Sequence, residues 1–180
     1  MIKSKTLGCL AGALAVAVLV AGCAGGHPAA TPGRTAPAAS APPTSLVHVP
    51  RPDYASPASV ASAFYSAWAS VDTIHDGPDS YSVRCAPLAT PSLERELSAG
   101  QPATAAWQEM RASRLVSLVQ VRAVTRPDGA PAPTASAAYL SVYATRVTTS
   151  TTGRTTVSDG VTLRLTRSRG RWLVSAVLFY

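Results

Sequence analysis

The residue types with the clearest chemical potential lie together at Asp72-Thr73-Ile74-His75-Asp76. A carboxylate can orient an imidazole and stabilise its protonated form, so Asp72 and His75 are candidates for a general acid–base pair. The segment also follows directly after a predicted helix, where such residues commonly form a cap or an exposed turn. We therefore expect a structural role first and keep catalysis by Asp72 or His75 as the alternative.

No other pattern in the sequence predicts an enzyme, a metal site or a cofactor. His27 and His48 lie in a Pro-rich segment apart from His75, and the spacing of zinc ligands does not occur. The part expected to fold has no Gly-rich phosphate loop, no nucleophile elbow and no paired carboxylates at helical spacing. The sequence thus favours a non-catalytic protein without a bound cofactor.

Four arginines surround one predicted hairpin turn: Arg164, Arg167, Arg169 and Arg171. We call this segment the arginine hairpin. Charged side chains in such a place commonly keep an exposed strand soluble. Guanidinium groups also bind anionic headgroups and acidic proteins, so the four arginines are candidate partner contacts. Tyr139 and Tyr143 share one face of a predicted strand, where a core or edge role competes with lining the mouth of a ligand cavity.

A single cysteine closes the apolar run near the N-terminus, in Val20-Ala21-Gly22-Cys23. Lys3 and Lys5 precede an uncharged stretch at 7–20, an order typical of a secretory signal and too short for a comfortable membrane span. The ending on cysteine resembles the lipobox of bacterial lipoproteins. The resemblance implies diacylglycerol transfer to the Cys23 thiol, cleavage before it and acylation there. The protein would then be lipid-anchored on the extracytoplasmic face of the cell membrane.

Net charge limits the classes of partner expected for the chain after residue 22, and its cysteine content indicates how the fold is held together. Its fourteen arginines, against nine acidic residues, leave a net charge of +5. This mild positive field favours anionic surfaces, whereas nucleic acid is not expected because no basic run with interleaved aromatics occurs. Cys85 is left without a disulfide partner, so an apolar core must hold the fold and Cys85 is expected to be buried in it.

Composition divides the chain into three segments. Residues 1–22 form the signal peptide. Residues 23–54 carry the lipidated cysteine and a tether rich in Ala, Pro, Thr and Ser, which has too few large apolar side chains to fold. Residues 55–180 form the domain.

Helices come first in this domain and strands follow. Ser56-Pro57 opens a helix whose apolar face, Val60-Phe64-Trp68-Val71, continues to about residue 72 or 73. Short helical segments are predicted at 80–85, 90–97 and 103–113. Alternating or β-branched residues predict four strands, near 115–123, 139–149, 157–166 and 172–179. Such segregation indicates an α+β fold with an antiparallel meander.

This order of elements resembles the nuclear-transport-factor-2-like superfamily. The last strand opens with Gly170-Arg171-Trp172-Leu173-Val174, and segment 60–68 resembles the long helix that packs across the cone of that fold. Segments 67–73 and 84–91 resemble small actinobacterial secreted proteins of this type. The resemblance covers residues 55–180. It implies N-terminal helices packed on a curved four-stranded antiparallel sheet.

The resemblance implies two classes of function. Such domains are either enzymes, chiefly ketosteroid-isomerase-like or polyketide-cyclase-like, or non-catalytic modules of conjugal-transfer scaffolds and Mce-associated proteins. A lipid anchor, a long tether and a basic surface favour the second class. We therefore expect a membrane-tethered interaction module in an envelope or conjugal-transfer complex, with the membrane and an envelope protein as partners. The sequence specifies no oligomeric state.

The alternative is a small-molecule-binding protein or an isomerase- or cyclase-like enzyme that uses the cavity of the cone. An open apolar cavity with an inward Asp or His would favour this alternative. A cone filled by Trp68, Trp107 and Trp172 would favour the interaction module.

Overall fold

The helix α1 (Pro57–Ala69) begins where the sequence predicts, in a computed structural model that describes residues 44–178. The Ser56 hydroxyl oxygen accepts a hydrogen bond from the Ser59 amide at 3.3 Å, and Pro57 occupies the first turn. The helix ends at Ala69 rather than near residue 72, because Ser70 is already extended. The predicted signal peptide and Cys23 lie outside the described residues.

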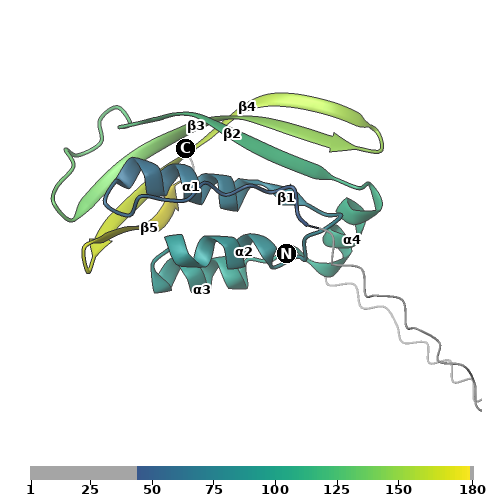
Figure 1. Cartoon of the computed structure of the whole chain (residues 1–180), viewed down its shortest axis with the longest axis horizontal. Coiled ribbons are helices and arrows are strands. Elements are labelled where there is room, and N and C mark those ends of the chain that lie inside the picture. Colours follow the sequence, from purple (N-terminus) through teal and green to yellow (C-terminus); the bar gives the residue numbers. More distant parts are fainter. Residues whose placement is uncertain (1–43, 179–180) are drawn as a thin grey trace, which may run out of the picture. The chain divides into compact units, whose positions relative to one another are not determined.

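Three further α-helices and one 3₁₀ turn follow α1. They are α2 (Ser80–Cys85), the 3₁₀ turn η1 (Ala86–Leu88), α3 (Pro91–Ala99) and α4 (Thr104–Ala112). Figure 1 shows α1 between the sheet on one side and α2 and α3 on the other. This middle position explains why both sides of α1 are buried, including Ala63 and Tyr65 beside the predicted Val60 and Phe64. No helix within residues 44–178 is long and apolar enough to cross a membrane.

The sheet has five strands rather than the four predicted. They are β1 (Val71–Asp72), β2 (Val116–Thr125), β3 (Ala137–Ser150), β4 (Gly153–Ser168) and β5 (Arg171–Leu178). They lie in the order β1-β2-β3-β4-β5, each antiparallel to its neighbour. The sheet curls over α1 as a half-barrel, and the predicted α+β class is confirmed.

The strand that the sequence did not predict is β1. It has two residues, which is too short for any periodic pattern, and it lies where the helix was expected to continue. Val71 pairs with Ser117 and Asp72 with Val116. The Thr73 amide extends the pairing with a 3.0 Å hydrogen bond to the Leu115 carbonyl. Only the return of β2 to this point in space makes these residues a strand.

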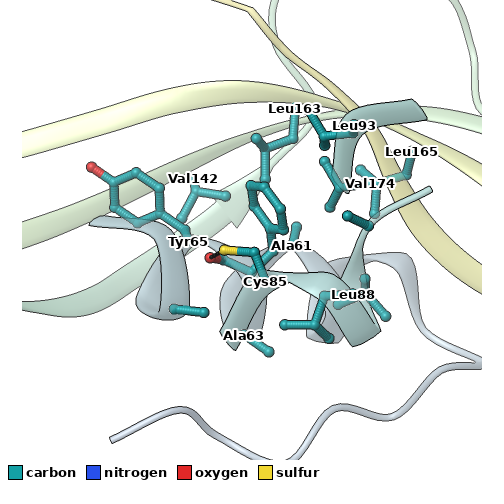
Figure 2. Packing of buried hydrophobic residues seen from close by; sticks show 14 of the residues in the cluster. Ala61, Ala63, Tyr65, Cys85, Leu88, Leu93, Val142, Leu163, Leu165 and Val174 are labelled. Carbon is teal, nitrogen blue, oxygen red and sulfur yellow. Dashed lines mark hydrogen bonds between the residues drawn. The ribbon is translucent and has the colours of Figure 1, made fainter. Parts of the chain in front are cut away.

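The core lies between α1 and the inner face of the sheet. Figure 2 shows Leu163, Leu165, Val142 and Val174 of the sheet gathered against the helices. Cys85 is fully buried among them, as expected, and burial raises its pKa to about 12. Its thiol is thus a small apolar group of the core.

The segment before α1 belongs to the folded unit. Composition assigned residues 23–54 to the tether, yet residues 44–54 lie against the domain. The Leu46 amide donates to Asp72, and Val49 and Tyr54 pack against the core. The Tyr54 carbonyl also accepts a 2.9 Å hydrogen bond from the Trp172 amide. These contacts are long-range, so a composition-based boundary could not include them.

Candidate functional site

The predicted acid–base pair does meet in the structure. The Asp72 side chain is completely buried, and its Oδ2 lies 2.7 Å from His75 Nδ1. The same Oδ2 accepts a hydrogen bond from the Leu46 amide at 2.9 Å, and Oδ1 accepts one from the Ile74 amide at 3.1 Å. Three donors therefore converge on one carboxylate, and we call this arrangement the Asp72 clamp.

The clamp holds Asp72 in its ionised form. Burial opposes ionisation, but the hydrogen bonds from His75, Leu46 and Ile74 outweigh it and hold the pKa of the carboxyl below its usual range. A general base at neutral pH needs a pKa nearer 7. The geometry therefore suits a structural anion that joins the start of the folded chain to β1.

The next carboxylate, Asp76, is also occupied by structural contacts. Its Oδ2 accepts hydrogen bonds from the Asp72 amide at 3.1 Å and from Arg84 Nη1 at 2.9 Å. Arg84 Nη2 donates in turn to the Ser70 carbonyl at 2.9 Å, just beyond the last turn of α1. A guanidinium at this place satisfies carbonyl groups that the end of a helix leaves free and complements its dipole.

A further ion pair, which was not predicted from the sequence, joins the sheet to α1. Arg146 on β3 contacts Asp159 on β4 through Nη2 and donates from Nε at 2.6 Å. Arg146 Nη1 also donates to the Ala69 carbonyl at 2.9 Å. Burial and the neighbouring Asp159 raise the pKa of the Tyr65 hydroxyl to about 12.

One sequence signal could have revealed this pair. The sequence Ser150-Thr151-Thr152-Gly153 is typical of a turn, and this turn sets the register in which Arg146 faces Val157. Asp159 then lies diagonally opposite Arg146 on the same face, within reach of a long side chain. The contact with Tyr65 could not be read in this way, because it depends on how α1 crosses the sheet.

An aromatic cleft of about 430 Å³ opens beside these ion pairs. Its aromatic walls come from α1, α2 and α4, and the most prominent are Trp68, Tyr81 and Trp107. Asp76, Arg84 and Arg146 also line it, whereas Asp72 and His75 do not. Trp107 is 5% exposed and Trp172 is 6% exposed, and Trp172 lies away from this cleft. Two of the three tryptophans thus line the cleft, and the third does not reach it.

The four arginines of the arginine hairpin are all exposed, as the predicted turn requires. The strands β4 and β5 pair up to Ser168 and Arg171, and Arg169-Gly170 forms the turn. Arg171 lies over the Tyr54 ring, with the guanidinium carbon 3.7 Å from the ring centroid. The structure thus gathers the four residues at one end of the sheet.

Tyr139 and Tyr143 share one face of β3, and it is the face turned away from α1. They alternate with Ala138, Val142 and Ala144, which are buried in the core. Tyr143 is 53% exposed and pairs with Gly160 of β4. These tyrosines therefore lie outside the space between sheet and helices and do not line a cavity mouth there.

The described part of the chain contains no group of side chains suited to binding a metal ion. Within residues 44–178, no three His, Cys, Asp or Glu residues are placed to hold a metal ion. The polar clusters at Asp72, Asp76 and Asp159 are instead held together by hydrogen bonds and ion pairs within the protein.

Comparison with known proteins shows only a distant likeness. No protein-family model matches the chain, and no curated protein matches it. Among solved structures, the intermembrane space region of the chloroplast protein ARC6 is similar, with a TM-score of 0.39 and 14% sequence identity. The likeness covers 73% of this chain and 100% of that chain. It is too distant to support a statement about family or function.

Proposed function

We propose that the protein is a membrane-tethered extracytoplasmic lipoprotein whose folded domain is a non-catalytic interaction module. In this proposal Cys23 carries the lipid and the segment after it is the tether. The domain is of the nuclear-transport-factor-2-like type and works in an envelope assembly such as a conjugal-transfer complex. A helix packed across a curled antiparallel sheet supports the proposed fold type.

The Asp72 clamp is the observation that carries the non-catalytic part of the proposal. Asp72, one of the two residues of the candidate acid–base pair, instead binds the segment around Leu46 to β1. That segment is the part of the described chain nearest to Cys23 in sequence. A tethered module needs a firm attachment at this point, because any pull on the tether is transmitted there.

Membrane fractionation of the Cys23→Ser variant tests the tether. The wild-type protein should be found in the membrane pellet with an acylated N-terminal cysteine by mass spectrometry. The variant should be found in the soluble fraction, because the thiol is the acceptor of the lipid. A variant that stays in the pellet and retains full function would contradict the proposal.

Crosslinking from intact membranes tests the interaction role. Wild-type protein should retain an envelope partner, and the Cys23→Ser variant should retain much less of it. Confinement near the membrane raises the effective concentration of such a partner, so loss of the anchor should weaken capture without any change in the domain. Equal capture by both forms would contradict a tethered module.

A second candidate function rests on the aromatic cleft. Its volume of about 430 Å³ and its walls of Trp68, Tyr81 and Trp107 suit a small apolar ligand. Titration with a hydrophobic dye should quench tryptophan fluorescence, and Trp107→Ala should weaken the effect. Binding of the dye with equal affinity to the Trp107→Ala variant would rule out the cleft as its site.

A further inference from the structure

The arginine hairpin is a rigid projection of the sheet. Arg169 and Gly170 both have positive φ, 50° and 81°, which is the geometry of a tight two-residue turn that follows the twist of the strands. Ser168 and Arg171 pair directly on either side of this turn. The arginines are therefore presented from a fixed backbone, which lowers the entropy lost when they bind.

The arginines are oriented by neutral groups and keep their charge. Arg164 Nε donates to Ser175 Oγ at 3.1 Å, and Arg167 Nε donates to the Gly170 carbonyl at 3.3 Å. Arg171 lies on the face of the Tyr54 ring. Every ion pair among residues 44–178 involves His75, Arg84 or Arg146, so none neutralises the arginine hairpin.

The arginines of the hairpin differ from those in the interior of the domain in having no acidic partner among the described residues. Arg84 and Arg146, which are largely buried, are each paired with an aspartate. A buried charge requires such a partner, whereas an exposed one does not. Four unpaired guanidinium groups around one turn therefore create a concentrated positive surface with no compensating carboxylate bound to it.

Protection of an open sheet edge does not account for these arginines. β5 is the last strand of the sheet, but two of its outer backbone groups near the turn are already bonded. The Trp172 amide donates to the Tyr54 carbonyl at 2.9 Å, and the Val174 carbonyl accepts from the Thr90 amide at 2.8 Å. An edge covered in this way is not available for pairing with another strand, so charge is not needed there to prevent aggregation.

The arginine hairpin lies at the end of the sheet opposite to the point where the chain enters the domain. Leu46 binds Asp72, Asp72 pairs with Val116, and Val116 is in register with Thr149 beside the β3–β4 turn. The other end of β4 carries the arginine hairpin, 16 residues along the strand. At about 3.3 Å per residue this is roughly 50 Å of chain, and Figure 1 shows the two turns at opposite ends of the sheet.

We propose that the arginine hairpin is the docking surface for a carboxylate-rich segment of an envelope protein. The inference rests on the proposed function, because a lipid at Cys23 would keep the exposed arginine hairpin close to other proteins of the envelope. Glu and Asp side chains fit the fork of a guanidinium with two parallel hydrogen bonds. Arginine is also less strongly hydrated than lysine, which favours such contacts.

The test compares two variants that lose the same charge. R164Q/R167Q/R169Q/R171Q removes the arginine hairpin. R111Q/R114Q/R122Q/R154Q removes four other exposed arginines, which lie on α4, between α4 and β2, on β2 and at the start of β4. The full chain in a non-ionic detergent is titrated with fluorescent poly-L-glutamate at low and physiological salt. Thermal unfolding followed by circular dichroism confirms that both variants are folded.

We expect the hairpin variant to bind poly-L-glutamate more weakly by between about tenfold and a few hundredfold, since each exposed ion pair contributes up to about fivefold. The control variant should stay within about threefold of wild type, since it keeps the docking surface. Equal losses in the two variants, or none in the hairpin variant, would overturn the proposal.

A parallel titration distinguishes a protein partner from the bilayer. Vesicles of phosphatidylglycerol are added to the Cys23→Ser chain and to the same chain with the hairpin substitutions. Vesicle binding that depends on the arginine hairpin, together with unchanged poly-L-glutamate binding, would assign the surface to the membrane and overturn the proposal. Peptide binding in detergent does not depend on acylation. A failure of the lipoprotein proposal would therefore appear in the fractionation of Cys23→Ser and not in this titration.

Discussion

Replacing Asp72 by asparagine tests the carboxylate that accepts hydrogen bonds from Leu46, Ile74 and His75. Asparagine keeps the shape but removes the charge, and one of its two terminal atoms becomes a donor. That donor must then face either the Ile74 amide or the pair formed by the Leu46 amide and His75. We expect the segment around Leu46 to detach from β1 and the domain to lose stability.

The size of the loss follows from the contacts. Hydrogen bonds to a charged group contribute about 1.5–3 kcal/mol each. All three donors to Asp72 lose their charged acceptor, and one or two of them, depending on the orientation of the amide, face an NH2 group instead. Leu46 is exposed and His75 is 19% exposed, so water replaces part of what is lost. The free energy of unfolding should fall by about 2–4 kcal/mol at pH 7.

The dependence on pH provides a second measurement. Because the pKa of Asp72 is held below its ordinary value of 3.8, its contribution to stability is fully present above that value. The contribution is lost as the pH falls through the lower pKa of the folded state. Asp72→Asn lacks this group, so the stability difference between variant and wild type should shrink in acid. The reverse trend would contradict the assigned direction of the shift.

Urea unfolding followed by tryptophan fluorescence measures the stability, and amide hydrogen exchange at Leu46 reports the local detachment. Asp128→Asn is the matched control, because Asp128 is exposed in the β2–β3 loop and should change stability by less than about 0.5 kcal/mol. If Asp72→Asn is as stable as this control and the Leu46 amide exchanges no faster, the reasoning about the clamp is refuted.

Three further predictions concern an ion pair, the buried cysteine and a glycine of β4. Arg146→Gln should lower the free energy of unfolding by about 2–4 kcal/mol. In a double-mutant cycle measured in urea, the double variant Arg146→Gln/Asp159→Asn should lose much less stability than the sum of the two single variants. Cys85 should resist thiol reagents at pH 8 in the folded protein and react after unfolding. The reason is that Cys85 is fully buried and burial raises the pKa of its thiol to about 12. Rapid labelling of the native protein would contradict this prediction. Gly160→Ala should cost about 1–3 kcal/mol in thermal or urea unfolding, since an added Cβ would lie 2.7 Å from the Val142 carbonyl oxygen, and a neutral result would show that β4 adjusts freely.

Local rules predicted the elements of the fold well. The cap at Ser56 and the strand β4 depend on neighbours within a few residues, and both occur. The alternation within β4 holds only in part, because Val157 is 51% exposed and Thr162 is buried. The burial of Cys85 followed from the absence of a disulfide partner and from its apolar neighbours. These features need no knowledge of how distant segments meet.

The candidate site was predictable only in part. The nearness of Asp72 and His75 is visible in the sequence, since they are three residues apart, but the contact with Leu46 spans 26 residues. It is that distant contact that turns the pair from candidate acid–base chemistry into a clamp. The aromatic cleft likewise needs three helices to be placed together before its walls exist.

Residue types and their spacing alone determined the helix starts, the antiparallel meander and the position of the arginine hairpin, because propensity, capping and turn geometry act over a few residues. Tertiary structure decided that β1 exists, that residues 44–54 belong to the folded unit, and that Arg146 and Asp159 join α1 to the sheet. Each of these depends on two segments far apart in the chain reaching hydrogen-bond distance. Such contacts are set by the packing of α1 against the curled sheet and leave no periodic trace in the sequence.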